Sequence, residues 1–258
     1  MDLRTDVPHG ARIWNYWLGG KDNFAADRAV GDAVKAAAPA VADYAVRSRG
    51  FLARAVRCLA ESGVRQYLDI GTGLPTAQNT HEVAQSVAPD AKVVYVDNDP
   101  LVLAHARALL RSTSAEGDTL YVDADYRRPD EIIEGAAELL DLDRPVAVLF
   151  MGVLGYLDDA DEAHSVVHRV LEAVPPGSYL ALWDGTDTSP MIRAAAAVQA
   201  GMGSPYRLRR VDQIERWFDG LELVEPGLVP ITSWRPADPA DGPVGPIDAY
   251  GGVARKPA

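Results

Sequence analysis

The sequence of 258 residues contains a single cysteine, Cys58. One cysteine excludes an intrachain disulfide and a cysteine-based metal cage. Basic residues are also scarce, because 25 Lys and Arg stand against 37 Asp and Glu and give a formal net charge of −12. Nucleic-acid binding draws its affinity from cations that neutralise phosphates. The charge therefore argues against DNA or RNA as a partner.

Long apolar runs are absent as well. No run approaches the roughly 20 residues that cross a bilayer, and the opening MDLRTDVPHG lacks the apolar region of a signal peptide. We therefore expect a cytoplasmic protein with no membrane partner. With 48% hydrophobic and 24% charged residues, the chain can bury a full core.

Motifs of several enzyme classes are missing too. His164 and His168 lie one helical turn apart, but Ser165 stands where a zinc-protease helix has glutamate, and no third ligand is evident. We therefore expect no metal. The chain has neither a G-x-S-x-G elbow nor a G-x-x-x-x-G-K-[ST] loop. This argues against acyl transfer by such a serine and against nucleotide hydrolysis.

Short apolar segments alternate with segments of helical spacing through the middle of the chain. The predicted strands lie at 65–70, 92–97, 119–125, 145–154 and 178–184. They are apolar on both faces, which is typical of a parallel sheet covered by helices. Farther on, the pattern predicts helices over 191–202 and 212–218, a strand over 221–231 interrupted by Pro226 and Gly227, a loop over 235–246 and a last strand over 249–256.

No strand is predicted before Arg65. The pattern there favours helices over 13–18, 24–38 and 41–61, with Gly63 ending the third. We therefore divide the chain into a helical cap or lid over 1–63 and a ligand-binding domain over 64–258.

The segment YLDIGTGLPT, residues 67–76, joins a predicted strand to a helix through a glycine loop. Such loops bind cofactors at the carboxyl edge of doubly wound sheets. Thr76 stands where a dinucleotide fingerprint has its third glycine, and a carboxylate at Asp69 would repel a pyrophosphate. The Asp69 carboxylate would instead attract the sulfonium and ammonium groups of S-adenosylmethionine, which favours this cofactor over a nicotinamide cofactor. A nicotinamide oxidoreductase stays an alternative.

Acidic residues end the next two predicted strands. Asp97 follows the glycine loop by roughly 20 residues, the spacing at which an acid binds ribose hydroxyls. Asp125, with Asp123 as its rival, could accept a hydrogen bond from the adenine amine. Helix capping is the alternative role for the acids around Asp97. The predicted cofactor contacts are Arg49, Asp69, Gly71, Thr72, Gly73, Asp97, Asn98, Asp125, Tyr126 and Gly152.

Several stretches resemble a family of bacterial S-adenosylmethionine-dependent methyltransferases, first catalogued as a domain of unknown function: ARIWNYWLGGKDNFAADRAV, RQYLDIGTGLPTAQNTHEVAQ, VVYVDNDP and PGSYLALWD. The resemblance covers nearly the whole chain. It implies a Rossmann-like class I methyltransferase fold of class α/β, with a seven-stranded, mostly parallel sheet, an antiparallel last strand and an N-terminal helical cap. Many members have a histidine after the fourth strand and another after the fifth, where this chain has Gly155 and Asp184.

The remaining predicted site residues concern the acceptor. Tyr156 and Asp184 follow the fourth and fifth strands and are the candidate catalytic groups, with an aromatic wall as the other role for Tyr156. At least one of Tyr16, Lys21 and Asn23 of the cap is expected to line the pocket beside the cofactor or acceptor, and Asn23 is also a candidate N-cap of the following helix. Arg49 is expected to pair with the methionine carboxylate, although it could belong to a solvated basic face. The predicted function is methyl transfer to an unknown small molecule, and the alternative is a non-catalytic S-adenosylmethionine sensor. The sequence leaves the oligomeric state open.

Overall fold

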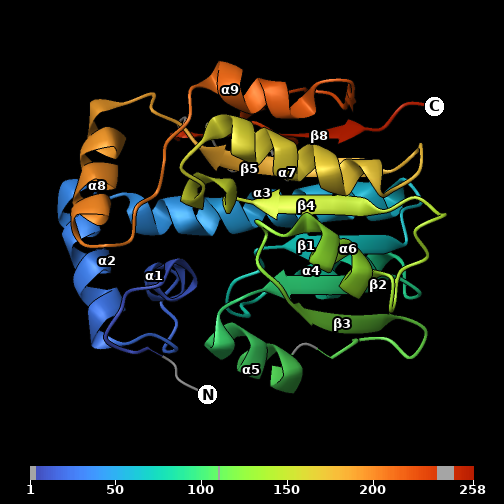
Figure 1. The fold of residues 1–258 in the computed structure, drawn as a ribbon, viewed down its shortest axis with the longest axis horizontal. Coiled ribbons are helices and arrows are strands. Elements are labelled where there is room, and N and C mark those ends of the chain that lie inside the picture. Colours follow the sequence, from blue (N-terminus) through green and yellow to red (C-terminus); the bar gives the residue numbers. More distant parts are fainter. Residues whose placement is uncertain (1–3, 110, 237–246) are drawn as a thin grey trace.

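The computed structural model describes residues 4–109, 111–236 and 247–258, and it contains one twisted sheet with helices on both faces (Figure 1). Five parallel strands in the order β3-β2-β1-β4-β5 form most of this sheet. They are β1 (Gln66–Ile70), β2 (Lys92–Asp97), β3 (Asp118–Asp123), β4 (Ala147–Met151) and β5 (Tyr179–Gly185). The five predicted strands are confirmed. The order reverses between β1 and β4, and ligands bind outside the carboxyl ends of strands at such a switch point.

The other edge of the sheet accounts for a difference from the seven strands expected, because the described residues form eight strands. The antiparallel β8 (Ala249–Arg255) pairs with β5 on one side, and with β6 (Glu222–Leu223) and β7 (Val229–Pro230) on the other. The predicted interruption at Pro226 and Gly227 separates β6 from β7. The sixth strand position is therefore divided in two, while the antiparallel last strand is as expected.

Two buried layers hold helices against the sheet. One contains side chains of α6 (Pro129–Ala136), α7 (Ala160–Glu172), α9 (Val211–Glu215) and the 3-10 turn η2 (Arg216–Phe218). The opposite layer contains side chains of α3 (Val41–Glu61), α4 (Thr80–Val87) and α5 (Pro100–Leu109). The carboxyl edge is thus left for the connecting loops, including the 3-10 turn η1 (Leu154–Tyr156) after β4.

The N-terminal helices α1 (Gly10–Trp17) and α2 (Ala25–Ala37) pack with α8 (Pro190–Gly201) in a separate apolar cluster. Figure 1 shows these three helices together, beyond the carboxyl ends of the parallel strands. The long α3 ends before Gly63, whose φ of +94° suits a residue without a side chain. α3 contributes Phe51 and Leu52 to the sheet's own core, unlike α1 and α2, and the segment up to the end of α2 is called the cap below.

Within the described ranges, no helix is long and apolar enough to cross a membrane. The same ranges contain no group of three or more His, Cys, Asp or Glu side chains arranged to hold a metal ion. His164 and His168 stack on α7 with ring centroids 4.1 Å apart. Most of the predicted loop over 235–246 lies outside the described residues.

Candidate functional site

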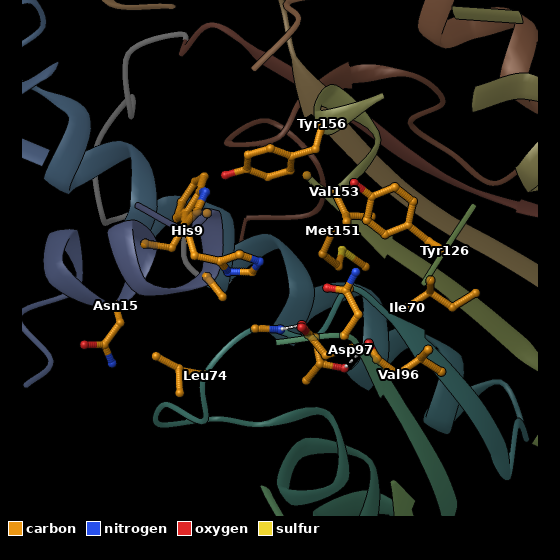
Figure 2. Close-up of a pocket in the computed structure, with 18 of the residues that line it drawn as sticks. His9, Asn15, Ile70, Leu74, Val96, Asp97, Tyr126, Met151, Val153 and Tyr156 are labelled. Carbon is orange, nitrogen blue, oxygen red and sulfur yellow. Dashed lines mark hydrogen bonds between the residues drawn. The ribbon is translucent and has the colours of Figure 1, made fainter. Parts of the chain in front are cut away.

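A cavity of about 370 Å³ opens at the carboxyl edge of the sheet. Its walls come from the loops after β1, β2, β3 and β4, from the end of β5, from α1 and α3, and from residues 203–205. Figure 2 shows side chains of the strand ends facing those of the cap across this space. The cavity therefore joins the predicted cofactor loop and the cap in one site.

The glycine loop follows β1 directly. Gly71 has φ +73°, and a Cβ there would come within 2.4 Å of Val153 Cγ2. Gly73 has φ +69°, but a Cβ there would meet no atom within 4 Å, and the residue lines the cavity. The Thr72 hydroxyl donates to the Asp69 carbonyl at 2.9 Å and closes the turn. The first glycine thus permits close packing, whereas the second leaves space open for a ligand.

Asp97 lies at the end of β2 and faces the cavity. One carboxylate oxygen accepts from the Gly73 N–H at 2.8 Å, and the other accepts from the Asp99 N–H at 2.9 Å. Burial raises the pKa of Asp97, while these two N–H groups act in the opposite direction. Each oxygen keeps a lone pair for a further donor. Asp97 is therefore a fixed acceptor at the mouth of the glycine loop.

Asp69 and Arg49 both line the cavity and lie close enough for their charges to interact, and the part that they line is called its charged end below. Thr80 Oγ1 donates to Asp69 Oδ2 at 2.6 Å, and burial raises the pKa of Asp69 to about 6 against the effects of Thr80 and the Arg49 charge. Arg49 Nη2 donates to the Gln78 carbonyl at 3.1 Å, and its Nε has no hydrogen-bond partner among the described residues. Burial lowers the pKa of Arg49. This end thus offers one anionic and one cationic group.

Aromatic side chains form another wall. Trp14 of α1 lies edge-on to Trp183 of β5, with ring centroids 5.9 Å apart. Trp183 covers Gly152, where a Cβ would come within 2.3 Å of its ring, and its buried indole N–H has no partner in the described part of the chain. Tyr156 lies against Gly10 of the cap, and burial raises its pKa above the ordinary tyrosine value. Trp14, Tyr156 and Trp183 are called the aromatic wall below.

Ten predicted residues line this cavity together: Arg49, Asp69, Gly71, Thr72, Gly73, Asp97, Asn98, Tyr126, Gly152 and Tyr156. Two other predicted acids do not. Asp125 accepts from the Arg127 N–H at 2.9 Å, so its carboxylate closes a local turn. Asp184 is buried away from the cavity, where it accepts from the Tyr206 hydroxyl and, at 2.7 Å, from the Gly185 N–H. Burial raises the pKa of Asp184 to about 6.

The three predicted cap residues also lie outside the cavity lining. The Tyr16 hydroxyl donates to Asp32 at 2.5 Å on the protein surface, and Lys21 is exposed. Asn23 is buried and donates to Asn15 Oδ1 at 2.9 Å and to the Gly20 carbonyl at 3.0 Å. The cap reaches the cavity through other residues of α1, because Trp14 lies on the helix face opposite Tyr16.

Sequence reasoning missed several lining residues. His9 enters the cavity just before α1, and Ser204 and Pro205 enter from the segment after α8. The sequence PHG, residues 8–10, contains one signal that could have been used, a histidine directly before a helix start. It does not indicate which distant strand the histidine lies against. Trp183 was overlooked in favour of its neighbour Asp184.

Comparisons with known proteins agree with this architecture. A family model described as S-adenosyl methyltransferase matches residues 1–257. A crystal structure of a DUF574 family protein from Streptomyces avermitilis is 45% identical, with a TM-score of 0.94 and coverage of 99% of this chain and 100% of that chain. A candidate methyltransferase from Thermobifida fusca is 41% identical, with a TM-score of 0.90 and coverage of 99% and 97%. No curated protein sequence matches the chain.

A more distant structure shows the shared fold alone. Human N-acetylserotonin methyltransferase, solved with S-adenosylmethionine, is 13% identical, with a TM-score of 0.51 and coverage of 90% of this chain and 57% of that chain. The family model and the two similar structures each span nearly the whole chain. The chain therefore belongs to the S-adenosyl methyltransferase family, whose members use S-adenosylmethionine as the methyl donor.

Proposed function

We propose that this methyltransferase transfers the methyl group to a small organic acceptor by in-line displacement. One observation carries the proposal: a single cavity contains the glycine loop and Asp97 together with the aromatic wall of Trp14, Tyr156 and Trp183. A cavity of about 370 Å³ is of the size that encloses small molecules. The net charge of −12 further disfavours a nucleic-acid acceptor.

The polar groups of the cavity fit S-adenosylmethionine, which has two cationic groups, a ribose diol and no phosphate. We assign Asp97 to the ribose, Asn98 and Tyr126 to the adenine, and the backbone of Gly71, Thr72 and Gly73 to the close approach of the ligand. Buried carboxylates next to the loop favour a cation and would repel a pyrophosphate. This supports the proposal over nicotinamide binding.

Asp69 and Arg49 are assigned to the methionine end of the cofactor. The Asp69 carboxylate would hold the ammonium group of the cofactor. The Nε of Arg49, which has no partner among the described residues, would donate to the methionine carboxylate of the cofactor. Both side chains line the same cavity, and the charge of Asp69 acts on the Arg49 guanidinium. Opposite charges at one end of a cavity match a zwitterion.

When bound, S-adenosylmethionine supplies an activated methyl group, so the protein mainly has to align the acceptor and exclude water. Alignment alone can contribute roughly 7–11 kcal/mol to lowering the barrier. We assign this task to the aromatic wall, with the free indole N–H of Trp183 as a donor to a polar atom of the acceptor. Tyr156 serves as wall because its raised pKa disfavours a phenolate base. Asp184 is not proposed as a base, since its side chain is buried outside the cavity lining.

Cofactor affinity should fall in acid if Asp69 holds the ammonium. The Asp69 pKa of about 6 means that below this pH the ligand must displace a proton, and the dissociation constant should rise by up to about tenfold per pH unit. Because the pKa of Asp69 is higher in the folded protein than in the unfolded chain, protonation of Asp69 stabilises the unliganded fold as the pH falls through about 6. Titration of Asp69 therefore does not lower the affinity by unfolding the protein. Calorimetry from pH 7.5 to 5 checks this, and Asp69→Asn should flatten the profile. An unchanged slope in Asp69→Asn would remove Asp69 from this role.

The acceptor class is tested with methyl-labelled S-adenosylmethionine and a bacterial extract separated into small molecules and macromolecules. We expect the label in the small-molecule fraction, with Lys21→Ala, an exposed residue away from the cavity, behaving like the unaltered protein. Label in protein or nucleic acid would contradict the proposed acceptor class. Binding of the donor without transfer to any fraction would instead favour a sensor.

A further inference from the structure

We infer that His9 is a cofactor-binding residue supplied by the cap, and that its imidazole and the Asp97 carboxylate together accept hydrogen bonds from the two ribose hydroxyls of S-adenosylmethionine. The inference rests on the cofactor site proposed above. Both residues line the cavity, and Figure 2 shows the His9 ring and the Asp97 carboxylate projecting into it from the cap and from the end of β2.

The contact between His9 and Asp99 fixes the orientation of the imidazole. His9 Nδ1 lies 2.9 Å from Asp99 Oδ2, and the Asp99 side chain is only 3% exposed. Although burial alone would raise the pKa of Asp99, its contact with His9, the Leu101 N–H and the Arg12 charge together lower it. Asp99 is therefore a carboxylate, and the Nδ1 of His9 faces it. With the ring proton on Nδ1, Nε2 is the acceptor that we assign to a ribose hydroxyl.

Charged groups around His9 hold its backbone as well. The His9 N–H donates to Asp27 Oδ1 at 2.9 Å. Arg12 Nε lies between the two acids, 3.7 Å from Asp27 Oδ1 and 3.4 Å from Asp99 Oδ2. Both acids and Arg12 are buried, whereas the His9 side chain is 39% exposed on the side of the cavity. The network therefore fixes the residue and leaves one face of its ring for a ligand.

The position of this pair favours the ribose over the reacting methyl group. His9 Nδ1 lies 2.9 Å from Oδ2 of Asp99, which lies two residues beyond Asp97 and whose N–H donates to the Asp97 carboxylate at 2.9 Å. The aromatic wall instead comes from α1, β5 and the turn after β4. Two neighbouring acceptors match a vicinal diol, which has two donors. His9 is accordingly assigned to binding and not to proton abstraction.

Calorimetry with adenosine and with adenine separates the ribose contribution from the base contribution. We expect His9→Ala to raise the dissociation constant for adenosine by about threefold to tenfold, the range for one hydrogen bond, and to leave that for adenine within about twofold. His9→Gln, which retains a side-chain acceptor, should recover part of the adenosine affinity. The matched control is His105→Ala, because His105 also faces an acid, Asp22 at 3.6 Å, but lies outside the cavity lining.

Other outcomes would overturn the inference. Equal losses for adenosine and adenine in both His9 variants would mean that His9 only anchors the cap, and unchanged adenosine affinity in both would mean that it makes no ligand contact. Either result leaves the proposed function standing if the unaltered protein still binds S-adenosylmethionine and transfers its methyl group. Failure of the unaltered protein to bind S-adenosylmethionine would remove the proposed cofactor site and this inference with it.

Discussion

Gly73→Val is expected to abolish measurable binding of S-adenosylmethionine while leaving the protein folded. A Cβ at Gly73 would meet no protein atom within 4 Å, so the new side chain would project into the cavity rather than into the core. The φ of +69° adds a backbone cost of about 1–2 kcal/mol, which a stable domain can tolerate. Calorimetry measures the binding, and circular dichroism measures the fold.

Gly63→Val is the matched control for backbone strain. Gly63 also has a positive φ, +94°, with open space around its Cβ position, but it lies after α3 and outside the cavity lining. We expect this variant to lose a similar amount of stability and no cofactor affinity. A folded Gly73→Val protein with normal affinity would refute the role of the loop.

Asp97→Ala is expected to reduce the free energy of S-adenosylmethionine binding by about 1.5–3 kcal/mol, the range for hydrogen bonds to a charged group. The substitution removes the ligand contact and also leaves the N–H groups of Gly73 and Asp99 without their carboxylate acceptor. The glycine loop would then lose one of its connections to β2, while the Gly71 N–H would still donate to the Val96 carbonyl at 2.9 Å. Calorimetry with S-adenosylmethionine and S-adenosylhomocysteine should show losses of the same size, because both ligands have the same ribose.

The control is Asp90→Ala, since Asp90 lies before β2 and pairs on the surface with Arg65 at 3.0 Å. Its removal should leave cofactor affinity unchanged. If Asp97→Ala bound both ligands normally, Asp97 would have no role in ribose binding, and the pairing proposed for His9 would lose its partner.

Much of the fold was predictable because its signals are local. The five parallel strands are short, apolar on both faces and separated by helical segments, and the structure has them within a few residues of the predicted bounds. The glycine loop and the acid after β2 have a fixed order along the chain. Residues that follow directly from strand ends therefore came together in the cavity, as Gly71, Gly73 and Asp97 do.

The rest of the site could not be predicted from the sequence, because it depends on the direction of side chains and on contacts between distant segments. Adjacent strand residues point to opposite faces, so the predicted site residue Asp184 lies away from the cavity while Trp183 lines it. An apolar run covered on both faces does not tell which face the ligand meets. The meeting of His9 with Asp99 joins segments 90 positions apart in the numbering, which no local periodicity can indicate.

The position of β8 between β5 and the short strands β6 and β7 has a consequence for the order in which the protein can assemble during synthesis. The strands from β1 to β5 can pair as soon as they leave the ribosome, and they contain the glycine loop, Asp97 and Trp183. In the described structure β6 and β7 pair with β8, which is made after them. β6 and β7 can join the sheet only after β8 has been synthesised. The nascent chain can thus bring the glycine loop, Asp97 and Trp183 together while β5 still lacks its neighbour β8.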